Sequence, residues 1–266
     1  MATALDKIID YKRDEVAASK QTRSVNELLN LASTAPKPRG FKAALARVAA
    51  ADENALICEL KRKSPSAGEI LPGANPTDIA SDYERGGAAC LSVLTDGPSF
   101  GGSLGDLEAI RQAVDIPLLR KEFMIDEYQV VEARAYGADA ILVILSAVDD
   151  ALASTLISAA DDLGMDVIVE VHDQGELERA NLLQGELVGI NNRDLKRMVT
   201  DLSTTERLAS KLAPEKSMIS ESGISTVSHI KRLRKSGARR FLIGESLMKS
   251  ANREQMCREL RLTSND

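Results

Sequence analysis

One stretch decides the fold class, residues 126–171, which read DEYQVVEARAYGADAILVILSAVDDALASTLISAADDLGMDVIVEV. It contains two short apolar runs, Ala140–Leu145 and Val167–Val171, which are separated by the amphipathic segment Asp149–Leu163. A second amphipathic segment, Asp126–Tyr136, precedes them and is followed by a glycine, which suits a left-handed residue at the end of a helix. Short apolar runs that alternate with helical segments are typical of βαβ units. The stretch therefore predicts a parallel sheet.

The same alternation continues on both sides of this stretch, from about residue 55 onward. Six further apolar runs are interpreted as strands: Ala55–Cys58, Cys90–Leu94, Ile116–Leu119, Leu187–Ile190, Ser217–Ser220 and Arg240–Gly244. Eight such units in 266 residues predict an α/β fold of the (β/α)8 TIM-barrel type, which needs roughly 250 residues. A doubly wound open sheet is the alternative. The absence of a GxGxxG turn favours the barrel, which also leaves no sheet edge unpaired.

The first 50 residues follow a different pattern and predict a helical extension. Its helices are expected over Thr3–Lys20, Val25–Ala32 and Gly40–Ala50. The extension is either a cap over one barrel mouth or a loose segment, and apolar residues at helical spacing favour docking. We expect residues 1–266 to form a single domain, in which 1–50 are the N-terminal extension and 51–266 the barrel.

Composition excludes several classes of protein. The net charge is −6, whereas nucleic-acid-binding proteins usually carry a basic stripe. The basic cluster Lys231, Arg232, Arg234 and Lys235 falls in a helical pattern and is interpreted as a solvated helix face. We therefore expect no nucleic-acid partner.

The cysteines and apolar runs indicate a protein of the reducing cytoplasm. Cys58, Cys90 and Cys257 are odd in number and widely spaced, which supports neither a disulfide framework nor a zinc site. No signal peptide is recognisable, and no apolar run approaches the ~18 residues of a membrane span. We expect a cytoplasmic location and no membrane partner.

Charged and amide side chains gather at the predicted C-terminal ends of five strands. They are Glu59, Lys61, Lys121, Glu170, Asn191 and Glu221. Residues two apart on a strand share a face, so Glu59 and Lys61 point to the same side. A barrel assembles its active site at these ends. A purely structural ion-pair network would explain any one of these residues, but the concentration of all of them at the catalytic end favours a function.

Two turns containing glycine follow the last two predicted strands, at Glu221–Ile224 and Ile243–Ser246. Barrels commonly bind phosphate in the loops after strands seven and eight, through backbone N–H groups. Gly223 and Gly244 allow the backbone to approach an anion closely. Together the turns predict a phosphorylated small-molecule substrate.

The two histidines of the chain are interpreted as incidental. His229 lies within a helical pattern, and His172 follows Glu170 at a strand end, where it has the means to orient that carboxylate. Neither belongs to a set with metal-ligand spacing, so we expect no metal.

At these residues the sequence resembles the indole-3-glycerol-phosphate synthase family. The matching stretches are Glu59–Ser66, Leu94–Asp96, Phe100–Ser103, Leu119–Phe123, Val169–His172, Gly189–Leu195, Ser220–Ile224 and Leu242–Met248. The similarity spans residues 1 to about 260, with no departure at the charged positions.

The resemblance implies a barrel whose N-terminal helical segment lies near the active-site mouth. It implies that 1-(o-carboxyphenylamino)-1-deoxyribulose 5-phosphate closes to indole-3-glycerol phosphate, with loss of carbon dioxide and water and without a cofactor, in tryptophan biosynthesis. We expect a monomer or weak homodimer.

The resemblance also implies roles for the strand-end residues. Lys121 is expected to protonate the ketose carbonyl, and Glu170 to act as a base and to stabilise a cationic intermediate. Lys61 and Glu59 are expected to position the substrate and to serve the dehydration. Asn191 and Glu221 would bind sugar hydroxyls or order the lysines.

The remaining site predictions concern the parts of the substrate. The candidates are Ser222, Gly223, Gly244 and Glu245 for phosphate, Arg193 and Ser64 for the carboxylate, and Phe100 and Phe123 for the aryl ring.

Three questions stay open from the sequence. Two lysines in one pocket lower each other's pKa, whereas nearby glutamates raise it, and the sequence does not decide between these effects. One rival function is a Schiff-base aldolase that uses Lys121. Another is a catalytically silent barrel kept as a scaffold.

Overall fold

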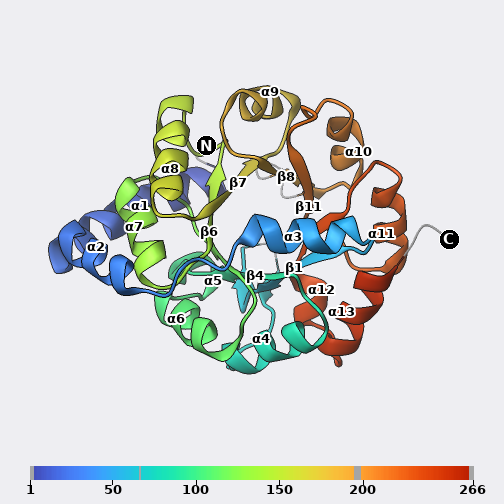
Figure 1. The fold of residues 1–266 in the computed structure, drawn as a ribbon, viewed down its shortest axis with the longest axis horizontal. Helices are drawn as coiled ribbons and strands as arrows, with labels where there is room; N and C mark the ends of the chain where they lie inside the picture. Colours follow the sequence, from blue (N-terminus) through green and yellow to red (C-terminus); the bar gives the residue numbers. More distant parts are fainter. Residues whose placement is uncertain (1–2, 66, 195–198, 264–266) are drawn as a thin grey trace.

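The computed structural model describes residues 3–65, 67–194 and 199–263. Two motif residues named above, Ser66 and Leu195, lie outside the described residues. Eight parallel strands close into a barrel: β1 (Ala55–Leu60), β4 (Cys90–Leu94), β5 (Leu118–Lys121), β6 (Ala140–Ile144), β7 (Asp166–Val171), β8 (Leu187–Asn191), β11 (Ser217–Glu221) and β12 (Arg240–Ile243). They pair in the order β1-β12-β11-β8-β7-β6-β5-β4, and Figure 1 shows the ring that they form. The predicted (β/α)8 barrel is confirmed, and the open sheet is wrong.

Helices surround the barrel, and polar N-cap residues begin most of them. They are α4 (Pro76–Arg85), α6 (Leu104–Ala113), α7 (Glu127–Ala135), α8 (Asp150–Asp162), α9 (Gln174–Leu182), α10 (Ser203–Ala209), α11 (Val227–Arg234) and α13 (Arg253–Leu262). Side chains such as Asp126 and Asp149 accept hydrogen bonds from the first turns of α7 and α8. Shorter elements are α5 (Gly97–Phe100), α12 (Glu245–Met248) and the two-stranded pairs β2 (Lys63–Ser64) with β3 (Gly68–Glu69) and β9 (Arg193–Asp194) with β10 (Val199–Thr200).

Strand β5 begins two residues later than the predicted run Ile116–Leu119. Pro117 has no N–H group to donate to the ladder, although its carbonyl accepts from the Leu91 N–H at 2.9 Å. The paired part of the strand therefore shifts toward Arg120 and Lys121. This shift places Lys121 inside the strand, where the barrel fixes its direction.

Alternation along the strands separates two apolar layers. One set of side chains, including Ile57, Leu142 and Ile168, fills the barrel interior, and the other set packs beneath the surrounding helices. Glu59 and Glu170 lie two residues beyond Ile57 and Ile168, so they point into the barrel above this interior layer. The interior core therefore forms the floor of the site.

The N-terminal extension covers both ends of the barrel. Its helices are α1 (Ala4–Thr22), α2 (Val25–Thr34) and α3 (Phe41–Ala50). Helix α3 crosses the middle of the ring in Figure 1, at the N-terminal ends of the strands. There the Phe41 carbonyl accepts from Cys90 Sγ at 3.6 Å, and the Lys42 N–H donates to Asp166 Oδ2 at 2.8 Å. Helix α2 packs on α7, and α1 reaches the opposite end. The sequence predicted either a cap over one barrel mouth or a loose segment. The extension is docked, and it covers both mouths.

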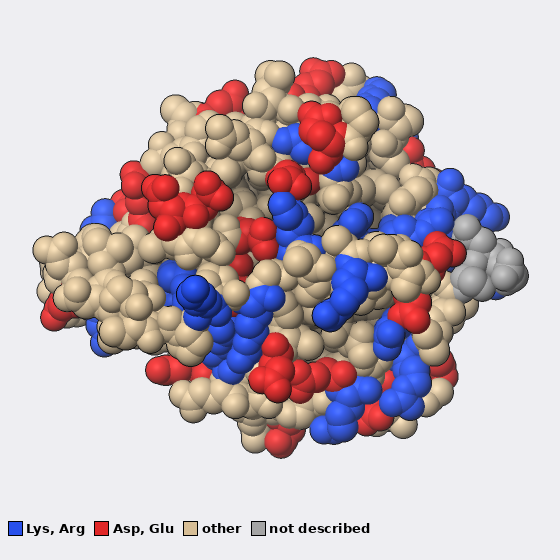
Figure 2. Space-filling model, viewed as in Figure 1, with Lys and Arg blue, Asp and Glu red and all other residues tan. Residues whose placement is uncertain are grey.

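One prediction about the surface of α11 was wrong. Arg234 is 2% exposed and donates to Asn54 Oδ1 at 2.7 Å and to Asp52 Oδ1 at 2.8 Å, so its assignment to a solvated helix face was wrong. The helix pattern gave no sign of these partners because they precede β1, 180 residues away. Positive and negative side chains are interspersed on the face in Figure 2. None of the described helices combines the length and the apolar character that crossing a membrane requires.

Candidate active site

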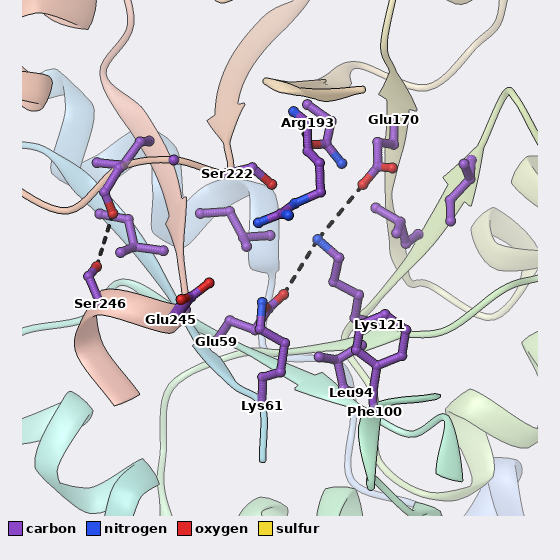
Figure 3. A pocket seen from close by; sticks show the side chains of 18 of the residues that line it. Glu59, Lys61, Leu94, Phe100, Lys121, Glu170, Arg193, Ser222, Glu245 and Ser246 are labelled. Carbon is purple, nitrogen blue, oxygen red and sulfur yellow. Dashed lines mark hydrogen bonds and ion pairs between the residues drawn. The ribbon is translucent and has the colours of Figure 1, made fainter. Parts of the chain in front are cut away.

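A cavity of about 440 Å³ lies at the C-terminal ends of the barrel strands (Figure 3). Most of the predicted site residues line it: Glu59, Lys61, Phe100, Lys121, Phe123, Glu170, Asn191, Arg193, Ser222, Gly223, Gly244 and Glu245. Two predicted residues are not among the lining. Glu221 is fully buried beneath the cavity. Ser64 lies in β2, where its hydroxyl accepts from the Ala67 N–H at 3.1 Å.

Lys121 is the centre of the charged cluster. Its Nζ lies 2.8 Å from Glu221 Oε2, 3.5 Å from Glu59 Oε2 and 3.8 Å from Glu170 Oε2. Burial lowers the pKa of Lys121, but the three carboxylates raise it by more, and the net shift is upward. The question left open by the sequence is answered here, because the glutamates outweigh any effect of the second lysine. Lys121 is a charged ammonium at neutral pH.

Lys61 joins the cluster through Glu59. Its Nζ lies 2.8 Å from Glu59 Oε1, on the carboxylate oxygen opposite to the one that faces Lys121. Burial raises the pKa of Glu59, yet Lys61 and Lys121 lower it by more. Glu59 is therefore an ionised bridge that holds both lysines at the same end of the cavity, as Figure 3 shows.

The other two glutamates differ in their protonation, although both are buried and both face Lys121. Burial raises the pKa of Glu170, but His172 and Lys121 outweigh it and bring the pKa to about 2. Burial also raises the pKa of Glu221, and Glu170 adds to this, so the pKa is about 7 despite Lys121. Glu221 Oε1 has no hydrogen-bond partner among the described residues. The site therefore combines a firmly ionised carboxylate with one that titrates near neutral pH.

The two turns after β11 and β12 form the opposite wall of the cavity. Ser222 and Gly223 have φ values of 66° and 78°, and for serine this left-handed conformation is uncommon. The carbonyl of Ser222 accepts from Asn192 Nδ2 at 3.1 Å, which holds the turn. Ser246 Oγ donates to the carbonyl of Ile224 at 2.9 Å and ties the two turns together. The turns present a fixed backbone surface to the cavity, as anion binding requires.

The rings of Phe100 and Phe123 form an apolar wall near Lys121. Their centroids lie 6.1 Å apart and their planes are inclined at 33°. Phe100 is the last residue of α5, and Phe123 follows β5 by two residues. This wall suits an aromatic ring.

Helix α1 supplies contacts that the sequence analysis missed. Tyr11 donates from its hydroxyl to Asp96 Oδ1 at 2.8 Å. Lys12 is 3% exposed, and its Nζ lies 3.0 Å from both Asp96 Oδ1 and Glu122 Oε1. A usable signal existed, because Lys12 falls between Ile8 and Val16 on the buried stripe of α1. A lysine on an apolar stripe indicates a buried acidic partner.

Lys12 connects the segments that carry the two aromatic rings. Asp96 caps α5, which ends at Phe100, by accepting from the Ser99 N–H at 2.9 Å. Glu122 immediately precedes Phe123 and accepts its N–H at 2.9 Å. The ammonium of Lys12 thus holds both aromatic segments in place from outside the barrel.

We expect Gly189→Ala to lower kcat about tenfold to hundredfold, because a misplacement of about 1 Å in a catalytic group has that effect. A Cβ at Gly189, in the middle of β8, would lie 2.1 Å from Glu221 Oε1 and would force this carboxylate out of its place beside Lys121. Gly175→Ala in α9 is the matched control, since its Cβ would have only an ordinary contact at 3.5 Å. Steady-state kinetics of both variants tests this, and an unaffected Gly189→Ala enzyme would contradict it.

The raised pKa of Glu221 predicts a pH dependence of stability. Between its ordinary value of 4.5 and about 7, the folded protein binds more protons at this group than the unfolded chain. The contribution of Glu221 to stability is thus present below 4.5 and declines as the pH rises toward 7. We expect Glu221→Gln to gain stability relative to the parent as the pH rises from 5 to 8, measured by urea unfolding. The exposed Glu108→Gln is the control, and parallel parent and Glu221→Gln curves would refute the prediction.

Comparison with known sequences gives a consistent result along the chain. Residues 5–260 match the family model described as indole-3-glycerol phosphate synthase. An indole-3-glycerol phosphate synthase of Hyphomonas neptunium is 64% identical over 260 residues, which cover 97% of this chain and 98% of the relative. That of Rhodospirillum rubrum is 49% identical over 250 residues, which cover 94% and 95%.

Solved structures of low sequence identity share the fold. The tryptophan synthase subunit alpha of Legionella pneumophila has a TM-score of 0.61 and 12% identity, covering 83% of this chain and 96% of that chain. A 3-hexulose-6-phosphate synthase has a TM-score of 0.62 and 18% identity, covering 77% and 97%. At these identities the likeness concerns the barrel alone.

Proposed function

The chain belongs to the indole-3-glycerol phosphate synthase family, and we propose that the charged cluster at its barrel mouth carries out that family's ring closure. The activity is that of a carboxy-lyase in tryptophan biosynthesis. It converts 1-(o-carboxyphenylamino)-1-deoxyribulose 5-phosphate into indole-3-glycerol phosphate, carbon dioxide and water. The observation that carries the assignment of roles is the contact of one half-buried lysine, Lys121, with three glutamates.

Lys121 acts as the general acid of ring closure. The aryl carbon that bears the carboxylate attacks the ketose carbonyl, and the carbonyl oxygen must gain a proton as the C–C bond forms. The raised pKa of Lys121 keeps its ammonium protonated and ready to donate. Carbon dioxide then leaves with the electron pair of its C–C bond returning to the ring. Glu221 accepts a hydrogen bond from the ammonium, and Glu59 and Glu170 hold it by charge.

Glu170 stabilises the positive charge that develops on the anilino nitrogen and ring. With a pKa of about 2 it is a permanent anion, which makes it a strong electrostatic stabiliser and a weak base. The new hydroxyl then leaves as water. Lys61 supplies the proton that the hydroxyl needs, and the ionised Glu59 beside it, 2.8 Å away, accepts the proton that the neighbouring ring methylene carbon loses as the indole double bond forms.

The shape of the cavity supports a single orientation of the substrate. The aryl ring packs against Phe100 and Phe123, and its carboxylate meets the guanidinium of Arg193, which faces the same cavity. The phosphate binds at the opposite wall, where Ser222, Gly223, Gly244 and Glu245 offer backbone N–H groups. Asn191 and Glu221 order the lysines and the sugar hydroxyls. Ser64 shapes the hairpin after β1, where its hydroxyl accepts from the Ala67 N–H, and its predicted role at the substrate carboxylate stays a prediction.

The charge state of Lys121 argues against a Schiff-base aldolase. Such an enzyme needs a neutral amine, which burial away from anions provides. Here three carboxylates surround the ammonium and raise its pKa. A scaffold without activity is disfavoured as well, because buried charges at this density are costly and serve no packing purpose. The contacts of α1 and α3 with the barrel support the proposal that residues 1–266 form one domain.

The proposal is tested by mixing purified protein with the carboxyphenylamino-deoxyribulose phosphate and following the fluorescence of indole-glycerol phosphate. We expect turnover without added metal or cofactor. Borohydride added during turnover should leave no covalent adduct on the protein, as judged by mass spectrometry. Folded protein without turnover would overturn the assignment, and an adduct at Lys121 would favour the aldolase.

A further inference from the structure

His172, which the sequence analysis treated as incidental, joins Glu170 to a second glutamate. It follows the last residue of β7, and its side chain is 10% exposed. Nε2 lies 3.2 Å from Glu170 Oε1, and Nδ1 lies 3.0 Å from Glu176 Oε2. The backbone N–H of His172 also donates to Glu176 Oε2 at 2.8 Å. Glu176 stands in the first turn of α9, so the three residues form a line from that helix into the cavity.

Both ring nitrogens of His172 face carboxylate oxygens. A neutral imidazole carries a proton on only one nitrogen, so it would turn a lone pair toward one of the two carboxylates. The doubly protonated ring is favourable at both contacts, because it forms a hydrogen bond to Glu176 through Nδ1 and an ion pair with Glu170 at Nε2. Burial lowers the pKa of His172, but Glu170 and Glu176 raise it by more, to about 10. His172 is therefore a buried cation.

A comparison within the site shows what this cation does. Glu221 is buried as Glu170 is, and it lies closer to Lys121, at 2.8 Å against 3.8 Å. The pKa of Glu221 is nevertheless about 7, whereas that of Glu170 is about 2. Lys121 alone thus does not keep a buried carboxylate fully ionised here. The main difference between the two glutamates is the imidazolium on Glu170 Oε1, and a hydrogen bond from Asn191 lowers the pKa of Glu170 further.

We propose that His172 is a positioning residue, which clamps Glu170 between two cations and keeps it ionised in the catalytic cavity, while Glu176 anchors His172 to α9. Its role rests on the proposed function, because Glu170 is the group through which it acts. His172 lies 3.2 Å from Oε1 on the outer side and Lys121 lies 3.8 Å from Oε2, so each oxygen of the carboxylate faces a cation. The ionisable groups that face this pair from other elements are Lys121, Glu59, Glu221, Glu176 and Arg193.

The decisive measurement is the pH profile of kcat/KM for His172→Gln and Glu176→Gln. Glutamine keeps a hydrogen-bond donor near Glu170 but carries no charge. We expect the acid limb of the profile to rise toward pH 7 in His172→Gln, because the pKa of Glu170 then approaches the value of about 7 that Glu221 has without an imidazolium, with a loss of about tenfold at pH 6 and a smaller loss at pH 9. Glu176→Gln should shift the limb in the same direction by less. A loss of equal size at every pH, or an unchanged profile, would overturn the proposal.

The second histidine of the chain provides the matched control and a direct probe. His229 lies in α11, and its ring contacts only Ser225 among the described residues. His229→Gln should keep the parental pH profile, and it leaves His172 as the sole imidazole for NMR. We expect both nitrogens of that ring to remain protonated from pH 6 to 8, and a neutral ring there would contradict the proposal even if His172→Gln failed to fold. This NMR measurement needs no substrate. If the parent showed no turnover, the proposed function would be overturned, and the NMR measurement would still test the charge of His172.

Discussion

Lys121→Ala will lower kcat by about a thousandfold or more. The loss of a positioned general acid typically costs a hundredfold to ten-thousandfold, and Lys121 also organises three carboxylates that otherwise repel one another. Without its ammonium, the pKa values of the buried glutamates rise, so the site loses its anions together with its acid. Substrate binding depends on other walls of the cavity, and we expect KM to change much less than kcat.

Two companion variants separate the possible reasons for this loss. Lys121→Arg keeps a cation among the glutamates but donates a proton poorly, so it should stay folded and remain nearly inactive. Lys7→Ala, on the exposed side of α1, should behave as the parent. Fluorescence-based initial rates at several substrate concentrations give kcat and KM for all three. If Lys121→Ala kept kcat within tenfold of the parent, the acid role would move to Lys61.

Lys12→Met will destabilise the fold by about 3–5 kcal/mol, which is the usual cost of removing one partner from a buried ion pair. Asp96 and Glu122 are both almost fully buried, and each lies 3.0 Å from the ammonium. Methionine has a similar length but leaves these carboxylates without their common cation. For a domain of this size the melting temperature should fall on the order of 10 °C, measured by thermal unfolding.

The neighbouring residue supplies the control for Lys12. Arg13 is 67% exposed and pairs with Asp10, which is 72% exposed, so Arg13→Met should change stability by well under 1 kcal/mol. A second readout distinguishes local from general damage. Because Lys12 holds the segments of Phe100 and Phe123, we expect its loss to raise KM at temperatures where the variant is still folded. A Lys12→Met protein as stable as the Arg13→Met protein would contradict the buried ion-pair interpretation.

Regular patterns made most of the barrel predictable from the sequence. Apolar runs of the correct length located the strands. Glu59 and Lys61 are two residues apart, and this spacing predicted that both side chains point into the barrel. The predicted start of one strand, at Ile116, was two residues too early, because Pro117 has no N–H group to donate to the β5 ladder. Local sequence thus determines the elements and the faces of the strands.

The remaining features depend on contacts between distant parts of the chain. The buried position of Arg234 requires partners near residue 52, and Lys12 meets Asp96 only because α1 docks across two loops. The pKa of Lys121 depends on the distances from its ammonium to the neighbouring charges. These distances cannot be derived from the sequence. His172 was overlooked for a local reason: Glu176 is only four residues further along the chain, and the turn into α9 brings its carboxylate back to the imidazole ring.

The two-ended extension described above has a consequence for the order of assembly. Its 50 residues leave the ribosome before the sites that they bind: Asp96 and Glu122 receive α1, and Asp166 receives α3. Until some 170 residues have been made, the buried faces around Phe41 and Ile8 have no barrel to cover. The apolar faces of the extension therefore stay exposed to solvent during most of the synthesis of the barrel. During that time they are available for binding by chaperones.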